Sequence, residues 1–243
     1  MGKNDIRNPA WLSLLAAALI LAGGSRALAQ VGGMGGGGIG GIGGMGGRGG
    51  MGSPGIEEST NSAPHDDKPD IAARKAYTAG QKSLDKGKAF AEAALQATNP
   101  DKKARFEEKA SDAFYKALDL FTEALSNRGD MAEAWNGAGY VHLHIGAFGE
   151  ALDDYNHDLK LRPDDRDAEF NRAEACLNLG RLDDVRLAYL GLISHAREKA
   201  DQLMRDMQRW VGERRGDPQG FRPAELDAFQ RWIDEQLKAQ SAP

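Results

Sequence analysis

A 34-residue spacing links four pairs of residues in this chain, and it constrains the fold more than any other feature of the sequence. The pairs are Gly139 and Ala173, Gly146 and Gly180, Ala151 and Val185, and Tyr155 and Tyr189. A fixed period of this length is typical of stacked helix–turn–helix units, because one such unit cannot bury its apolar face without a neighbour. The spacing therefore predicts an all-α chain built as a short solenoid of helical hairpins.

The unit from 132 to 165 carries the pattern of one complete repeat. A large apolar residue is followed four positions later by a small one, then by a glycine at the turn, a small residue that opens the second helix, an aromatic residue and a closing proline. These are Trp135, Gly139, Gly146, Ala151, Tyr155 and Pro163. In these residues the unit resembles the tetratricopeptide repeat (TPR) family, which implies pairs of packed helices. His142 and Asp158 depart from the family's usual aromatic residue and alanine, so we expect looser packing at both positions.

The next unit, 166–199, keeps part of this pattern. Its matching residues are Ala173, Gly180, Leu182, Val185 and Tyr189. It lacks the tryptophan and the closing proline. The resemblance is closest over 132–165, extends to about 193, and is only architectural for 70–130. We therefore place TPR-like repeats in 131–199.

An elongated helical hairpin, a divergent first repeat, is predicted for 70–130. Asn99-Pro100 divides this segment into two helices, because proline disfavours helix at the residue before it. The helices are expected at 70–98 and 101–127. The first contains two glycines that weaken it and could split it in two.

Capping helices are predicted for 200–243. Residues 183–214 could run as one extended helix, which the glycines and proline of 216–220 would end. Pro223 then opens a last helix that ends near Leu237. We expect this helix to cap the open end of the solenoid, as repeat arrays require. Alternatively it occupies the binding groove, or a partner helix displaces it.

Residues 1–29 have the features of an export signal. Lys3 and Arg7 form a basic start, residues 11–22 an apolar run of 12, and the Ala-Leu-Ala sequence at 27–29 a cleavage site. A spanning helix needs about 20 apolar residues, so an uncleaved anchor is the alternative interpretation. We expect an exported bacterial protein, periplasmic or secreted, without a membrane span after cleavage.

A glycine-rich segment at 30–69 follows the signal. Residues 32–55 contain 16 glycines, which lose much backbone entropy on ordering and offer little surface to bury, so a disordered tether is expected. A threefold glycine-rich helix that associates with itself is one alternative. Copper binding is another, although the methionines that would bind it are irregularly spaced. These are Met34, Met45 and Met51.

The charge of the mature chain argues against nucleic acid as a partner. Removing Lys3, Arg7, Arg26 and Asp5 with the signal leaves 28 basic and 35 acidic side chains, a formal charge of −7. One cysteine cannot form an internal disulfide, and Cys176 falls on an inward-facing position, so we expect a small core residue there.

The sequence contains none of the common catalytic motifs. A phosphate-binding loop, a nucleophile elbow and a zinc-binding HExxH helix are all missing. His142 and His144 are two residues apart, so they point to different sides of a helix and cannot bind one metal ion together. We predict no enzyme activity, no metal and no cofactor.

The TPR resemblance implies a concave groove lined by the first helix of each unit. Its outward positions are Glu133, Asn136, Tyr140, Leu143 and His144 in one unit, and Asp167, Phe170, Glu174, Leu177 and Asn178 in the next. One subset of the family binds a peptide's C-terminal carboxylate with lysine, arginine and asparagine. Here the groove positions carry three acids and no lysine, and like charges repel. We therefore expect a partner segment with apolar and basic side chains.

Taken together, these features predict a periplasmic scaffold that binds a peptide or helix of another protein in this groove, without chemistry. The alternative hypothesis is a structural envelope component that self-associates through its glycine-rich segment and terminal helices.

Overall fold

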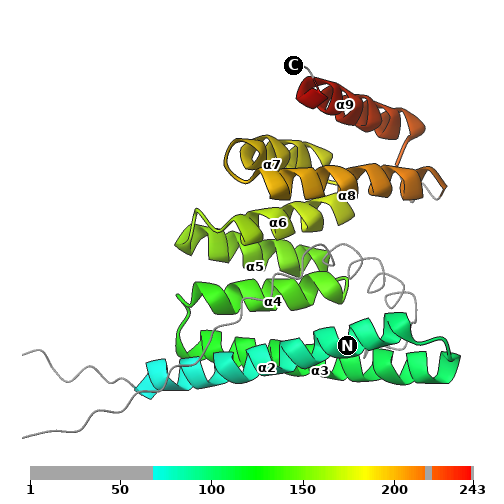
Figure 1. Cartoon of the computed structure of the whole chain (residues 1–243). Helices are drawn as coiled ribbons and strands as arrows, with labels where there is room; N and C mark the ends of the chain where they lie inside the picture. Colours follow the sequence, from blue (N-terminus) through cyan, green and yellow to red (C-terminus); the bar gives the residue numbers. More distant parts are fainter. Residues whose placement is uncertain (1–67, 217–220, 242–243) are drawn as a thin grey trace, which may run out of the picture.

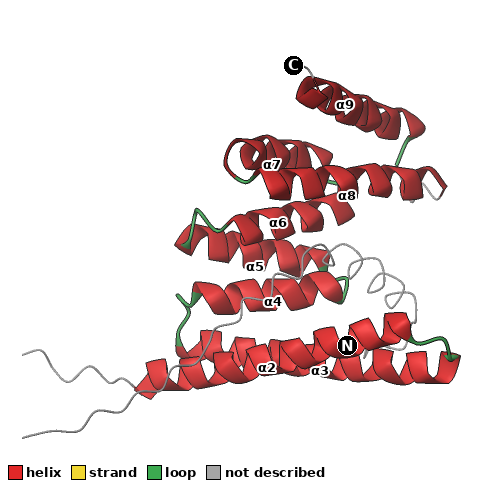
Figure 2. Ribbon diagram, in the orientation of Figure 1, coloured by secondary structure: helices red, strands yellow, loops and turns green. Residues whose placement is uncertain are grey.

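The computed structural model describes residues 68–216 and 221–241, and within these ranges every regular element is a helix (Figures 1 and 2). The all-α prediction is confirmed. The predicted export signal and nearly all of the predicted tether lie outside the described residues. The helices are α2 (Lys68–Gln96), α3 (Pro100–Asn127), α4 (Ala132–His144), α5 (Phe148–Leu161), α6 (Arg166–Asn178), α7 (Leu182–His195), α8 (Arg197–Gly216) and α9 (Pro223–Ser241).

The helices stack in successive pairs, with the long α2–α3 hairpin at one end and α9 at the other (Figure 1). Each of α2, α4 and α6 contacts the next first helix of the stack, so that α2, α4, α6 and α8 follow one another. We call the side of α4 and α6 that carries the ten predicted contact positions the inner face. This succession brings α2 and α8 to the two borders of the inner face.

The two glycines of α2 do not split this helix, because each meets an aromatic ring of α3. A Cβ atom at Gly80 would lie 2.8 Å from Cδ1 of Phe121, and one at Gly87 would lie 2.8 Å from Cδ1 of Phe114. Gly137 of α4 approaches the same Phe121 ring, with its virtual Cβ 2.6 Å from Cζ. Phe121 is fully buried between α2 and α4. The glycines therefore serve close packing.

The predicted turns of the two repeats are confirmed in their backbone conformation. Gly146 and Gly180, one period apart, have positive φ values of 80° and 71°. Glycine adopts this left-handed conformation without the steric penalty that a Cβ atom brings. The break between α2 and α3 is equally well marked, since the Asn99 side chain accepts a 3.0 Å hydrogen bond from the Lys102 backbone N–H.

The single extended helix expected over 183–214 is wrong. The chain leaves helical geometry at Ala196, whose φ and ψ are −145° and 58°, and α7 and α8 are separate helices. The break lets α8 fold back against α6 as well as α7. Leu203 and Met207 of α8 are fully buried in the core that results. Burying this apolar stripe offsets the cost of interrupting the helix.

The last helix caps the stack and does not lie on the inner face. It packs against α8 (Figure 1), and the Trp232 ring meets Tyr189 of α7 edge-on with centroids 5.5 Å apart. Phe229 and Ile233 are fully buried. The helix begins at Pro223, as predicted, and continues to Ser241, one turn beyond the expected end. Of the two positions considered for this segment, the cap and not the groove is observed, and displacement by a partner helix stays a hypothesis.

Candidate functional site

The ten predicted contact residues differ widely in exposure. Glu133 and Asp167 are exposed, and Asn136, Tyr140 and Asn178 are partly buried. The remaining five, which the register also directs to the inner face, are buried. These are Leu143, His144, Phe170, Glu174 and Leu177. The inner face therefore has an exposed acidic rim on α4 and α6 and a floor whose side chains are packed.

An aromatic and cationic cluster forms the α4 part of the inner face. The rings of Tyr140 and His144 stack with centroids 3.9 Å apart, and Nζ of Lys88 from α2 lies 4.0 Å from the Tyr140 centroid. His144 Nδ1 lies 2.9 Å from the Tyr140 carbonyl oxygen, which only accepts, so this nitrogen carries the hydrogen. Burial lowers the pKa of His144 to about 4. The neutral ring leaves Nε2 as a buried acceptor without a partner within 68–216 and 221–241.

A second lysine lies over the aromatic residue of α6. Nζ of Lys199, at the start of α8, is 5.3 Å from the Phe170 ring centroid and pairs with the Asp167 carboxylate. The two large aromatic side chains of the inner face are thus each covered by a lysine from a neighbouring helix. Cation–π attraction stabilises both arrangements.

One buried carboxyl group of α6 and one of α8 interact with each other. Glu174 of α6 is 8% exposed and Asp206 of α8 is 5% exposed. Burial raises the pKa of Glu174 to about 8, and the charge of Asp206 adds to the rise. Burial also raises the pKa of Asp206, to about 6, although Arg209 donates a 2.5 Å hydrogen bond to its Oδ1. The other oxygen, Oδ2, is buried without a partner in the described part of the chain.

The residues that depart from the TPR pattern form hydrogen-bonded pairs between α4 and α5. Asn136 donates a 2.7 Å hydrogen bond to Oδ2 of the fully buried Asp158, and Arg162 donates to Oδ1 at 2.7 Å. His142 Nδ1 lies 2.6 Å from Asp154 Oδ2. Polar pairing therefore takes the place of the apolar contact at both positions, where we expected looser packing.

The ten predicted contact positions carry no lysine, but two lysines reach the inner face from outside the two repeat units. Lys88 and Lys199 reach the inner face from α2 and α8. Asp206 and Arg209, which face Glu174, also come from outside these units. None of the four belongs to the 34-residue register, so the period could not identify them. The contacts of Lys88 and Lys199 with aromatic rings depend on how the helices stack.

One exposed cluster contains the residue types of a hydrolytic relay. Ser194 Oγ lies 2.8 Å from His195 Nδ1, and His195 Nε2 lies 3.5 Å from Glu169 Oε2. The Ser194 hydroxyl also lies 2.8 Å from the Gly191 carbonyl oxygen, which only accepts, so this oxygen competes with His195 for the one hydroxyl hydrogen. The described residues also hold no group of three His, Cys, Asp or Glu side chains suited to a metal ion.

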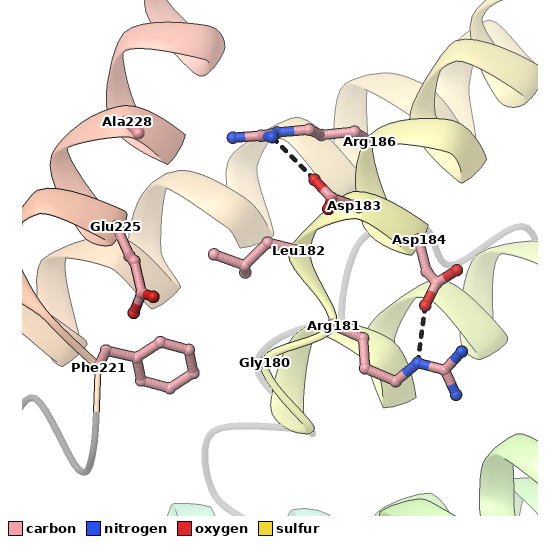
Figure 3. A pocket seen from close by; sticks show the side chains of 9 residues that line it. All are labelled: Gly180, Arg181, Leu182, Asp183, Asp184, Arg186, Phe221, Glu225 and Ala228. Atoms are coloured by element: carbon pink, nitrogen blue, oxygen red, sulfur yellow. Dashed lines mark hydrogen bonds and ion pairs between the residues drawn. The ribbon is translucent and has the colours of Figure 1, made fainter.

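A separate cavity of about 500 Å³ lies where the α6–α7 turn meets α9 (Figure 3). Phe221 projects toward Gly180, and Leu182 and Ala228 complete an apolar lining. The charged side chains at its edge are already paired. The pairs are Arg181 with Asp184 at 2.7 Å and Arg186 with Asp183 at 2.9 Å. The cavity therefore offers apolar surface where α9 meets the α6–α7 turn, and the two arginines at its edge are each paired with an aspartate.

Comparison with known proteins finds similarity over part of the chain. No protein-family model matches. A curated protein of Candida albicans, described as a peroxisomal targeting signal receptor, is 34% identical over 95 residues. The match covers 39% of this chain and 16% of that protein. The chain therefore corresponds to a small part of this relative. In the described residues, no helix is both long and apolar enough to cross a membrane.

Proposed function

We propose that this chain is an exported scaffold of the TPR class that binds a peptide or helix of another protein on its inner face. The observation that carries the proposal is the shared register of α4 and α6. Tyr140 and Glu174, one 34-residue period apart, occupy the same position on two adjacent first helices. Equivalent positions thus recur along the stack, as an extended ligand requires.

Two further observations support protein binding. The relative with partial similarity is named as a peroxisomal targeting signal receptor, and a receptor is a binding protein. Two buried acceptor atoms, His144 Nε2 on α4 and Asp206 Oδ2 on α8, have no hydrogen-bond partner among the described residues. Buried polar groups of this kind are costly, and a bound donor would remove the cost.

The exposed acids of the rim favour a partner with basic side chains. Glu133 lies at the start of α4 and Asp167 at the start of α6, one period apart. Both carboxylates lie near helix N-termini, where the helix dipole stabilises them. A basic side chain of a partner would be attracted along this rim, and an acidic one would be repelled.

Location and mode of action follow from the N-terminal sequence and the class of fold. Export to the bacterial periplasm, or secretion, is proposed on the basic start, apolar run and cleavage site of residues 1–29. Docking without chemistry is proposed because the sequence carries no phosphate-binding loop, nucleophile elbow or zinc-binding HExxH helix.

Site-specific photocrosslinking in the producing cell tests the docking face. A photoreactive residue replaces Glu133 or Asn178 on the inner face, and the matched control replaces Asp153, which is exposed on α5. We expect one protein to be crosslinked from both inner positions and not from the control. Equal crosslinking from Asp153 would contradict the proposed docking face.

A further inference from the structure

Glu174 and Asp206 carry two buried carboxyl groups that interact electrostatically. These residues come from α6 and α8, and both are more than nine-tenths buried. Arg209 occupies one oxygen of Asp206, while Oδ2 has no partner in the described part of the chain. A buried acceptor with no donor requires an explanation, and here the charge of Asp206 also acts on a second buried carboxyl group, that of Glu174.

In the described part of the chain, the groups that interact with Glu174 come from three other helices. Tyr140 of α4, Tyr155 of α5, and Asp206 and Arg209 of α8 all interact electrostatically with it. Lys199, at the start of α8, does so as well. Arg209 and Lys199 favour the ionised form of Glu174, while burial and the charge of Asp206 disfavour it. The second effect is larger, so the pKa of Glu174 reaches about 8. At neutral pH the site therefore holds a proton on Glu174.

A cationic donor suits this site better than a neutral or an anionic one. An anion would face two carboxyl groups, and a neutral donor would satisfy Oδ2 without favouring ionised Glu174. The rings beside the pair already attract the chain's own cations, as Lys88 over Tyr140 and Lys199 over Phe170 show. A guanidinium has several donors in one plane and can bond two carboxylates at once.

We infer that an arginine side chain of the docked partner binds between Glu174 and Asp206 and displaces the proton that Glu174 holds. This inference rests on the proposed function and names the partner chemistry at one point of the inner face. The exchange is balanced: the neutral Glu174 carboxyl group releases one proton to solvent, and the guanidinium stays protonated and pairs with the carboxylate that remains. The affinity should then rise about tenfold for each pH unit up to about pH 8 and level off above it.

The probe for this site is the peptide acetyl-Ala-Arg-Ala-amide, with the neutral citrulline peptide as its matched control. The mature full-length chain is labelled with ¹³C at glutamate side chains, and the Glu174 carboxyl signal, assigned by its loss in Glu174→Gln, is titrated with pH. With the arginine peptide at millimolar concentration, we expect the pKa of Glu174 to fall by at least one unit. The citrulline peptide should leave it unchanged.

Two variants separate recognition from folding. Glu174→Gln keeps the size of the side chain and should remove the pH dependence of peptide binding between about pH 6 and pH 8, where Asp206 is ionised, while Asp206→Asn should weaken binding at least fivefold at pH 8. The control Asp153→Asn, exposed on α5, should change neither. Thermal unfolding shows which variants remain folded, and Glu174→Gln decides the matter if Asp206→Asn does not fold.

Equal effects of the arginine and citrulline peptides, or a Glu174 titration that neither changes, would overturn the arginine site. If the inner-face crosslinks persist in that case, the partner docks without an arginine and the proposed function stands. If the crosslinks are lost as well, both proposals fall.

Discussion

Asn136 and Asp158 form a 2.7 Å hydrogen bond across α4 and α5, from the amide Nδ2 to the carboxylate Oδ2. Asp158 is fully buried, at a position where the TPR pattern has a small apolar residue. Its burial raises the pKa of the carboxyl group, and the hydrogen bonds from Asn136 and Arg162 oppose the rise. The polar pair thus replaces apolar packing inside the first repeat and commits Asn136, a predicted contact residue, to the interior.

This pair predicts a coupling that a double-mutant cycle can measure. Asn136→Ala should destabilise the protein by about 1–3 kcal/mol, because it leaves one oxygen of a buried carboxylate without its donor. Asn136→Ala combined with Asp158→Ala should cost clearly less than the sum of the single changes. Urea unfolding gives the free energies, with Asp153→Ala on the exposed side of α5 as the control. Additive effects would show that the hydrogen bond contributes nothing.

The close contact between Gly137 and the Phe121 ring leads to a second prediction. Gly137→Ala should destabilise the protein by about 1–3 kcal/mol, because the added methyl group overlaps the buried Phe121 ring. Gly212 of α8 has no atom within 4 Å of its virtual Cβ, so Gly212→Ala should stabilise by up to about 1 kcal/mol through helix propensity alone. Thermal unfolding of both variants checks the opposite signs. A stabilising Gly137→Ala would contradict the packing described for Phe121.

The two turn glycines predict unequal costs for the same change. Gly146 and Gly180 both have positive φ, but only Gly180 faces a ring, that of Phe221 at the cavity in Figure 3. Gly146→Ala should cost about 1 kcal/mol for the strained backbone alone. Gly180→Ala should cost more, because it also displaces Phe221, whose ring packs edge-on against Trp210 with centroids 5.1 Å apart. Calorimetric unfolding measures the difference, and equal losses would mean that Phe221 adds nothing to the anchoring of α9.

Glu174 predicts a pH dependence of stability that should be visible in unfolding experiments. Its pKa is raised from 4.5 to about 8 in the folded chain, so the folded state binds a proton that the unfolded state releases between these values. Its contribution to the free energy of unfolding is therefore fully present below pH 4.5 and is lost as pH rises to 8. Each pKa unit is worth about 1.4 kcal/mol, so the total is a few kcal/mol.

Glu174→Gln should flatten this profile and make the variant more stable than the parent above pH 8. Denaturant unfolding at pH 5, 7 and 9 checks the slope. A variant whose stability keeps the parental pH dependence would show that Glu174 is ionised in the folded protein at neutral pH.

The sequence predicts the parts of this structure that depend on local chemistry. The turn glycines, the Asn99-Pro100 break and the Pro223 start are each marked by a residue with a special backbone preference. The break at Ala196 carries no such mark, because it follows from the packing of α8 against α6 and α7. A helix end without glycine or proline is set by tertiary contacts.

The sequence predicts the positions of the candidate site on α4 and α6 but not the residues that other helices add, because those depend on tertiary contacts. The 34-residue register places Tyr140 and Glu174 at equivalent positions, but it cannot place residues of α2 and α8, which do not follow the period. Lys88 precedes Tyr140 by 52 residues and Asp206 follows Glu174 by 32. Helix stacking brings Lys88 over the Tyr140 ring and Asp206 into electrostatic contact with Glu174.

Binding of the crosslinked partner to charge-reversed inner-face variants tests the central claim most directly. Glu133→Arg and Asp167→Arg change the two exposed acids of the rim, and Glu150→Arg and Asp153→Arg are matched changes on α5. Titration calorimetry of the mature chain with that partner should show at least a tenfold loss of affinity for each inner-face variant, about 1.4 kcal/mol, and less than a twofold change for the controls. Equal affinities for all four variants would contradict docking on the inner face.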